Sequence, residues 1–286
     1  MLQNLLYNEF SWDEARPQLC ALWREAFGDS DAFIDAFMRL FGVQGCVHAL
    51  SINGRVVAAL YSLPYCLQCG EKKLNVAYIY AVATDKNYRG EGIMRSLMSR
   101  VHTILRARGY AAALLLPSSP SLAAYYGSMG YEWCAARLKM FFELCDAVPR
   151  PLSLQRCNAS DGAVFDFIES SLVGRADNIL HPRQALELNR LSCELSGGGL
   201  FAVVCQRAIV AAAFLSIVDG EPLVLDIFAD TPEAEELLLG ALCREFSVSS
   251  LSLLCCDNKN GAPFAMALPF EESFPATFGV QLMLDK

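Results

Sequence analysis

Hydrophobic and polar positions in the first forty residues follow a helical spacing. Residues 12–27 repeat large apolar side chains every three or four positions, and Gly28 then ends the pattern. Residues 30–41 predict a second helix, which either Ser30 or Asp31 caps. The chain is therefore expected to open with two helices that each bury one face.

The next stretch changes to the pattern of β-strands. Residues 46–52 and 56–67 are strand-like, and Asn53-Gly54 between them is a strong hairpin signal. The run 74–84 is rich in Val, Ile and Tyr without clear alternation, which is typical of a central strand buried on both faces. We expect a three-stranded meander at this point.

An amphipathic helix follows the polar loop at 85–90. Its apolar stripe covers residues 93–105, and Gly109 ends it. Four arginines, at positions 95, 100, 106 and 108, lie off this stripe. The half then closes with a predicted strand at 110–116, a short helix near 122–129 and a strand at 133–144.

Val148-Pro149-Arg150-Pro151 marks a predicted domain boundary, with residues 1–147 before it and 148–286 after it. The second part repeats the order of the first, which indicates an internal duplication with a period of roughly 140 residues. The predicted fold class is α/β (α+β), with a mixed, mostly antiparallel central sheet flanked by helices in each domain. The elements expected here are strands at 152–156, 200–205, 209–218, 223–229, 251–256 and 276–284, and helices at 161–172, 182–195 and 232–246, the last capped by Thr231.

Composition limits the classes of function. With 54% hydrophobic and 19% charged residues, the 286-residue chain can bury a large core. Its longest apolar runs, 76–83 and 208–215, are far shorter than the roughly 20 residues of a membrane span. No secretory signal is visible, so we expect a cytoplasmic protein. A net charge of −8 argues against nucleic acid and favours either a cationic substrate or plain solubility.

The 12 cysteines are interpreted as reduced thiols, mostly buried. Cys66 and Cys69 form a C-x-x-C pair, but zinc would need two more ligands, and none of the three histidines is suitably spaced. We therefore expect no metal. A mean hydropathy of +0.30 leaves room for an apolar interface in a homo-oligomer.

Residues 80–94 carry the strongest chemical signal. They predict a strand, a loop and the start of a helix, with Gly90 and Gly92 removing side chains where a ligand could approach the backbone. The first helical amides have no partner within the helix, so they suit a pyrophosphate, and Arg89 adds a positive charge. The alternative is an ordinary glycine-containing turn.

Arg89-Gly90-Glu91-Gly92 resembles the R/Q-x-x-G-x-G/A signature of the GNAT superfamily of N-acetyltransferases. Met94 stands where the signature has its last small residue, and a longer apolar residue at this position resembles the Eis-like (enhanced intracellular survival) branch. Glu91 departs from that branch, which has a basic residue at the corresponding position. Residues 121–131, with Tyr126-Gly127 and Gly130-Tyr131, resemble a second family element, and residues 22–29 resemble the first helix of the branch. The resemblance covers residues 1 to about 145. It implies tandem GNAT-like domains, the second degenerate, without the sterol-carrier-like domain of Eis-like proteins.

The resemblance implies acetyl-CoA as cosubstrate and a primary amine, on a small molecule or a peptide, as acceptor. The amine attacks the thioester directly, with the Val82 amide as a candidate oxyanion donor and Glu132, Tyr80 or a water chain as candidate base. Eis-like enzymes use a chain-terminal carboxylate, which here belongs to a different domain. Tyr126 is the implied proton donor to the CoA thiolate, with a packing role for Tyr126 and a catalytic Tyr125 as alternatives. The implied CoA-binding residues are Val82, Ala83 and Thr84 for pantetheine, Arg89, Gly90, Glu91, Gly92, Ile93 and Met94 for pyrophosphate, and Ser121 near the thioester.

The second domain lacks this loop, because its equivalent helix opens with Pro232 and three glutamates, which repel phosphate. We expect it to bind no CoA and to help wall the acceptor pocket. Besides an N-acetyltransferase, two functions remain open. One is a non-catalytic acyl-CoA-binding sensor or scaffold, and the other is a tandem aminoacyl transferase.

Overall fold

The chain forms two compact units whose segments alternate along the sequence. The structure is a computed structural model that describes residues 5–9, 12–42, 46–144, 153–175, 177–280 and 284. Unit 1 contains residues 1–67, 73–132 and 266–275, and unit 2 contains 68–72, 133–265 and 276–286. The units thus interleave, whereas the sequence analysis placed one boundary after residue 147, at a motif that lies outside the described residues.

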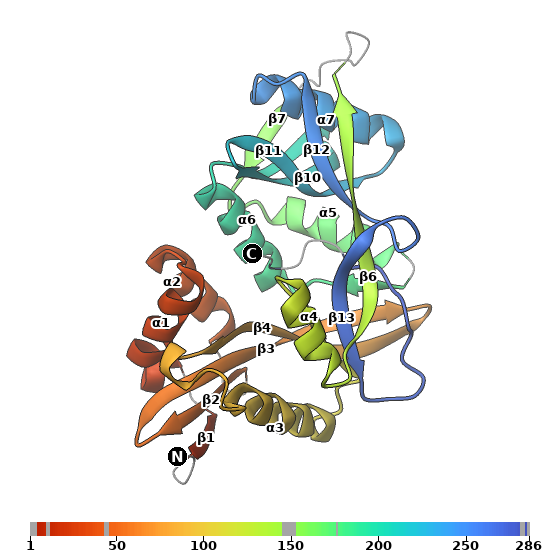
Figure 1. Cartoon of the computed structure of the whole chain (residues 1–286). Helices are drawn as coiled ribbons and strands as arrows, with labels where there is room; N and C mark the ends of the chain where they lie inside the picture. Colours follow the sequence, from red (N-terminus) through yellow and green to blue (C-terminus); the bar gives the residue numbers. More distant parts are fainter. Residues whose placement is uncertain are drawn as a thin grey trace. The chain divides into compact units, whose positions relative to one another are not determined.

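Unit 1 is a mixed sheet with helices on both faces (Figure 1). Its strands follow the order β1-β2-β3-β4-β5-β13, in which β4 and β5 are parallel and the pairs β1/β2, β2/β3 and β5/β13 are antiparallel. The elements are β1 (Leu5–Glu9), α1 (Trp12–Phe27), α2 (Asp31–Phe41), β2 (Val47–Ile52), β3 (Arg55–Cys69), β4 (Lys72–Thr84), η1 (Lys86–Tyr88), α3 (Ile93–Ala107), β5 (Ala112–Leu115), α4 (Pro120–Gly127) and the end of β13 (Ala262–Pro269).

The local signals of the first half are confirmed. Ser30 is the cap of α2, and its hydroxyl accepts a hydrogen bond from the Phe33 amide at 3.3 Å. Asn53 and Gly54 both have positive φ, 51° and 77°, as a two-residue hairpin turn of the primed type requires. These features depend on neighbours in sequence, so the pattern alone could predict them.

Strand β4 is buried on both faces, as its composition predicted. Ala77 and Ile79 belong to the core under α3, together with Leu97 and Val101 of that helix. Tyr80 lies on the opposite side, in an aromatic cluster with Trp23 of α1 and Phe37 of α2. Strand β4 and helix α3, which line the cavity described in the next subsection, are therefore both anchored in a packed core.

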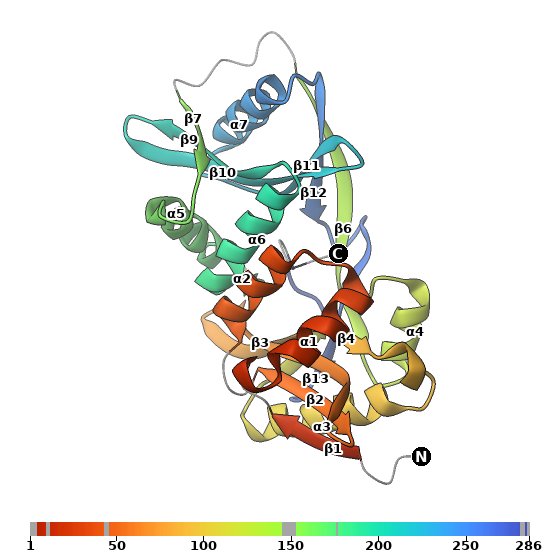
Figure 2. The ribbon, with the colours of Figure 1, turned by 90° about the vertical axis from the view of Figure 1, so that its left-hand side faces the viewer.

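The strands of unit 2 follow the order β6-β12-β11-β10-β9-β7, with helices on both faces. Figure 2 shows α7 on one face and α5 and α6 on the other, and two separate hydrophobic clusters fill these interfaces. Thr231 caps α7 as predicted. The elements are β6 (Glu132–Glu143), β7 (Leu154–Cys157), α5 (Gly162–Val173), β8 (Asn178–Leu180), α6 (Arg183–Leu195), β9 (Gly199–Cys205), β10 (Ala208–Val218), β11 (Glu221–Ala229), α7 (Pro232–Glu245) and β12 (Ser250–Cys256).

The predicted strand at 276–284 is wrong over its described part. Residues 276–280 form no strand and make only an isolated bridge between Gly279 and Asn178. Among the described residues the last strand is β13, which contains Pro263 and ends at Pro269, and prolines argue against a strand when only the sequence is considered. None of the helices among the described residues is long and apolar enough to cross a membrane.

Candidate functional site

A cavity of about 630 Å³ opens in unit 1 where β4 ends and α3 begins. All the residues predicted to bind CoA line it except Glu91 and Ser121, and the predicted catalytic Tyr126 lines it as well. The cavity thus brings together two segments that the sequence analysis joined only by family resemblance. Its lining residues are Ala26, Phe27, Val82, Ala83, Thr84, Tyr88, Arg89, Gly90, Gly92, Ile93, Met94, Arg95, Ser118, Leu122, Tyr125 and Tyr126.

The open edge of β4 forms one wall of this cavity. The parallel pairing of β4 with β5 runs only from Val76 to Tyr78, whereas at its far end Asp85 still donates its amide to the Val57 carbonyl of β3 at 2.9 Å. Ala81 has φ 47°, which an L-residue rarely adopts and which re-aims the strand as a bulge does. The register between β4 and β5 therefore ends at Tyr78, before Val82, Ala83 and Thr84 of β4, which line the cavity.

The loop between β4 and α3 is held by a buried carboxylate. Asp85 accepts hydrogen bonds from the Asn87 amide at 2.9 Å and from Arg55 at 2.6 Å. Burial alone would raise the pKa of this carboxyl, but the Asn87 amide and the Arg55 guanidinium outweigh it and hold the pKa below its usual value. The side chain is therefore ionised at neutral pH and acts as a fixed anchor for the loop.

The N-terminus of α3 has the backbone form of an anion site. Gly90 and Gly92 have φ of 82° and 74°, in the left-handed region that glycine favours. Gly92 is the N-cap and supplies no side-chain hydrogen bond, so the first amides of α3 keep their donors for a ligand. Glu91, which the sequence analysis included among the CoA-binding residues, is exposed and does not line the cavity.

Arg89 and Arg95 supply positive charge to the rim. The Nε of Arg89 donates to the Thr84 carbonyl at 3.0 Å, which ties this exposed side chain to the end of β4. No carboxylate among the described residues pairs with it. Arg95 donates to the Ser128 carbonyl at 3.3 Å and lies 5.5 Å from the centre of the Tyr125 ring. The sequence analysis placed Arg95 off the apolar stripe but did not identify it with the site.

Tyr126 is a buried phenol on the cavity wall. Burial, and secondarily Tyr125, raises its pKa to about 12. The Tyr126 ring packs edge-on against Tyr131 at 5.9 Å between ring centres. Among the described residues no group hydrogen-bonds to the Tyr126 hydroxyl, so this donor is free for a ligand.

The short helix α4, which carries Tyr126, is capped by Ser119. The Ser119 hydroxyl accepts from the Leu122 amide at 3.2 Å and lies 3.0 Å from the hydroxyl of Ser121. Ser121, which the sequence analysis placed near the thioester, is exposed and does not line the cavity. Its neighbours Ser118 and Leu122 line the cavity instead.

We expect Ser119→Ala to lower the free energy of unfolding by about 1 kcal/mol, because an N-cap hydroxyl satisfies an otherwise unpaired helical amide. Urea unfolding of the variant against wild type measures this loss. Ser121→Ala is the matched control, since that hydroxyl caps no amide. Equal losses in the two variants would show that Ser119 has no capping role.

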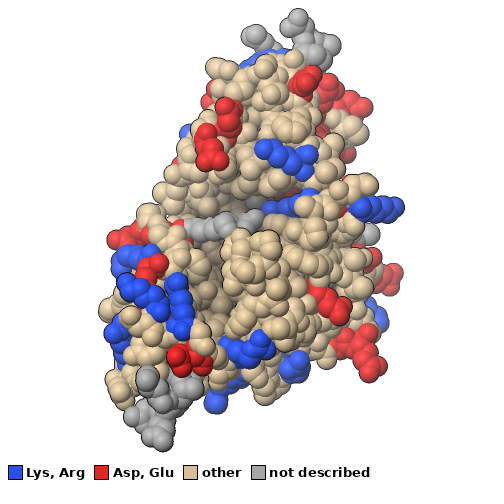
Figure 3. All heavy atoms as spheres, in the orientation of Figure 1, with Lys and Arg blue, Asp and Glu red and all other residues tan. Residues whose placement is uncertain are grey.

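The candidate bases do not line the cavity. Glu132 is exposed at the start of β6, and Tyr80 is buried in the aromatic cluster around Trp23. The chain-terminal carboxylate lies outside the described residues. Within the described chain, no group of three or more His, Cys, Asp and Glu side chains could hold a metal ion. On the face drawn in Figure 3, acidic and basic side chains are interspersed rather than separated.

Comparison with known proteins gives one family match. Residues 11–134 match the family model described as "Acetyltransferase (GNAT) domain". This segment contains the whole cavity lining. A search of the curated proteins found no match.

Solved structures resemble the chain over both units. A conserved Enterococcus faecalis V583 protein, described as a probable N-acyltransferase, is 16% identical with a TM-score of 0.74, and the match covers 92% of this chain and 71% of that one. A GCN5-related N-acetyltransferase from Kribbella flavida is 17% identical with a TM-score of 0.70, covering 92% and 70%. Eis1 from Mycobacterium abscessus is 14% identical with a TM-score of 0.66, covering 93% and 73%. Such identities show the fold alone, and they confirm the predicted α+β class.

Proposed function

We propose that the protein is an acetyl-CoA-dependent N-acetyltransferase acting on a primary amine, and the match of residues 11–134 to the GNAT acetyltransferase domain model supports this proposal. The observation that carries the proposal is the composition of one cavity. It combines the N-terminus of α3, the end of β4 beyond its register with β5, and the hydroxyl of Tyr126, which has no hydrogen-bond partner among the described residues. These are the groups that a diphosphate, a pantetheine amide and a departing thiolate require.

The diphosphate of CoA fits the start of α3. Backbone amides after Gly92 and the positive end of the helix dipole favour a dianion there. Arg89 adds a positive charge, and its side chain is positioned by its hydrogen bond to the Thr84 carbonyl. The pantetheine arm carries amides that can pair with the free edge of β4 around Val82 and Thr84. Met94 lines the same cavity and offers it an apolar contact.

Acyl transfer in this cavity needs no protein nucleophile. The amine nitrogen attacks the thioester carbonyl, the C–N bond forms, the C–S bond breaks, and the amine proton passes to a base or solvent. The backbone amide of Val82 is our candidate for stabilising the oxyanion. With a pKa of about 12 the Tyr126 phenol stays protonated, but full proton transfer to a thiolate of reference pKa near 8.5 is unfavourable. We therefore assign Tyr126 a hydrogen bond to the departing sulfur.

We expect Arg89→Ala to weaken CoA binding about tenfold, because it removes a charge beside the diphosphate. Isothermal titration calorimetry of the purified protein with CoA measures this. Lys86→Ala is the matched control, since Lys86 is an exposed cation in the same loop that does not line the cavity. Equal affinities of Arg89→Ala and wild type would refute the diphosphate assignment, and a folded wild-type protein without affinity for CoA would refute the proposed function.

A non-catalytic acyl-CoA-binding protein is the second candidate. The observation that favours it is that neither Glu132 nor Tyr80, the two side chains considered as bases, lines the cavity among the described residues. Steady-state release of CoA thiol from acetyl-CoA, measured with a panel of alkyl, aryl and peptide amines, distinguishes the two. Amine-dependent turnover supports the enzyme, and tight binding without turnover for any amine supports the sensor or scaffold.

A further inference from the structure

Strand β6 of unit 2 directs alternate main-chain groups to its two edges. Its residues 137–143 pair with β12 in an antiparallel register without a bulge. The Leu144 amide, next in the chain, donates to the Ser249 carbonyl at 2.8 Å, so the even-numbered residues exchange their hydrogen bonds with β12. The N–H and C=O groups of the odd-numbered residues therefore point to the opposite edge.

Strand β13 covers only the first part of that opposite edge. Gly261, just before β13, packs so closely against β6 that a Cβ on it would lie 2.7 Å from the Arg137 carbonyl oxygen. From there β13 runs back toward the start of β6, since the Cys134 thiol donates to the Ala265 carbonyl at 3.3 Å. Among the described residues, the strand neighbours of β6 are β12 and β13 alone. Residues 139–143 thus form a free edge, which another extended segment can join.

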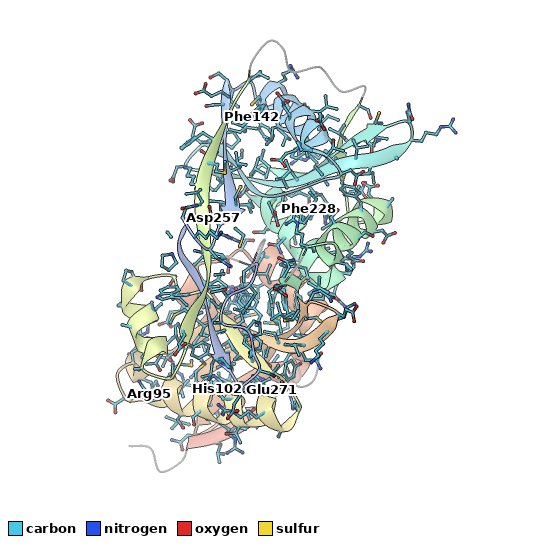
Figure 4. The ribbon with its side chains drawn as sticks, turned by 90° about the vertical axis from the view of Figure 1, so that its right-hand side faces the viewer. Arg95, His102, Phe142, Phe228, Asp257 and Glu271 are labelled. Atoms are coloured by element: carbon cyan, nitrogen blue, oxygen red, sulfur yellow. The ribbon has the colours of Figure 1, made fainter. Side chains whose placement is uncertain are left out.

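The free edge carries large apolar side chains that the chain itself does not cover. Met140 and Phe141 are 46% and 69% exposed, whereas Phe142, labelled in Figure 4, packs into the core between the sheet and α7. Lys139 and Glu143 are exposed at the two ends of the edge, and the Lys139 ammonium lies 5.6 Å from the centre of the Phe141 ring. Opposite charges therefore stand two positions before and two positions after an exposed aromatic residue.

We propose that this free edge pairs with the same edge of a second copy of the chain, antiparallel about a two-fold axis at Phe141. Lys139 then lies opposite the partner's Glu143, and Glu143 opposite the partner's Lys139. The odd-numbered residues of the two strands face each other and exchange about six hydrogen bonds. Phe141 packs against its own copy on one face of the extended sheet, and Met140 packs against the partner's Phe142 on the other.

Charge selects both the occupant and the register. Directly opposite side chains of an antiparallel pair lie close together, so the proposed register flanks the aromatic pair with two Lys–Glu pairs. An axis at Phe142 places Glu143 opposite the partner's Phe141 and loses both charge pairs. An axis at Met140 needs the part of the edge at Arg137, which β13 already covers.

The proposed contact uses the same surface on both copies, so it closes as a dimer and leaves no edge for further copies to join at this position. It goes beyond the proposed function and does not depend on it, because β6 residues 139–143 belong to unit 2 and the CoA cavity to unit 1.

The test measures the dimer dissociation constant of the purified full-length chain by sedimentation velocity, from about 1 to 100 µM. Lys139→Glu and Glu143→Lys each turn both opposite-charge pairs into like-charge pairs. The double variant Lys139→Glu/Glu143→Lys restores opposite charges at the same positions. The control is Arg207→Glu, which makes the same change of charge on an exposed residue in the turn between β9 and β10. Thermal melting checks the fold of each variant.

We expect wild type and the control to dimerise with a dissociation constant of about 10 µM, and each single variant to dimerise at least about tenfold more weakly. The double variant is expected to return to within about threefold of wild type. Phe141→Asp, a second test at a side chain that is exposed in the single chain, is expected to abolish the dimer, because it sets two carboxylates together at the axis.

Wild type that stays monomeric at about 100 µM overturns the proposal. A dimer that survives Phe141→Asp unchanged places the contact on another surface and overturns it as well. If the double variant dimerises as weakly as the single variants, Lys139 and Glu143 are not paired across the axis, and the proposed register is wrong.

Discussion

Replacing Tyr126 with phenylalanine is expected to lower kcat about 100-fold while leaving the affinity for CoA within about twofold of wild type. A donor that acts only as charge develops in the transition state contributes on the order of 100-fold to 1000-fold when it is removed. The Tyr126 phenol is buried on the cavity wall, and its hydroxyl has no hydrogen-bond partner among the described residues. The substitution deletes this donor and preserves the ring that packs against Tyr131.

Tyr125→Phe is the matched control for this experiment. The two tyrosines are adjacent in α4 and line the same cavity, but Tyr125 is only half-buried and stacks with the Arg95 guanidinium through its ring. We expect its kcat to change less than about threefold, because the ring remains. A Tyr126→Phe enzyme as fast as wild type would make Tyr126 a packing residue, and a large loss in Tyr125→Phe alone would transfer the donor role to Tyr125. Both measurements require an amine that supports turnover.

Acidification is expected to cost unit 1 about 2–3 kcal/mol of unfolding free energy between pH 7 and pH 4.5 through His102 alone. Burial, and secondarily Arg106, lowers the pKa of this imidazole to about 4, against about 6.5 in an unfolded chain. Between these values the unfolded state binds more protons than the folded state, so stability falls as the pH falls through the window. His102 shares a hydrogen bond of 2.9 Å with the Tyr131 hydroxyl, which keeps it in the core.

Urea unfolding of wild type and His102→Gln at pH 7 and pH 4.5 measures this contribution as the difference between the two pH dependences. Wild type alone is insufficient, because Asp226 in unit 2 acts in the opposite direction. Burial raises the pKa of its carboxyl to about 6, so the folded state binds more protons there and gains stability on acidification. Asp226→Asn therefore provides a companion variant of opposite sign. Identical pH dependences of wild type and His102→Gln would contradict the assignment to His102.

The candidate site was predictable to the extent that it depends on short segments. Gly90, Gly92 and the amphipathic helix after them lie within residues 90–107, and the structure places the two glycines and the start of that helix at one wall of the cavity. Family resemblance then joined Tyr126 to them. Glu91 and Ser121 were included because they belong to the matched motifs, but their side chains are exposed outside the lining. A motif identifies a segment, whereas the direction of each side chain depends on the packing around it.

Some of the lining residues that the sequence analysis missed come from other parts of the fold. Phe27 closes α1, far from the motif, and no local pattern distinguishes it from the other apolar residues of that helix. Arg95 lies within the motif helix but was interpreted only as part of its polar face. Arg95 becomes part of the site because it contacts Ser128 and the Tyr125 ring, which hold it beside the cavity. Ser128 lies more than thirty residues away from Arg95 in the sequence.

The sequence by itself determined the helices, the hairpin at Asn53-Gly54, the caps at Ser30 and Thr231, and the turn at Gly90 and Gly92, because hydrophobic period, capping and positive φ act between residues close in the chain. Only the tertiary structure decided that β13 is the last strand among the described residues, that β13 pairs with β5, and that the segments of the two units alternate along the sequence. Strand pairing joins residues about 150 positions apart, and its free energy comes from contacts that no local pattern contains.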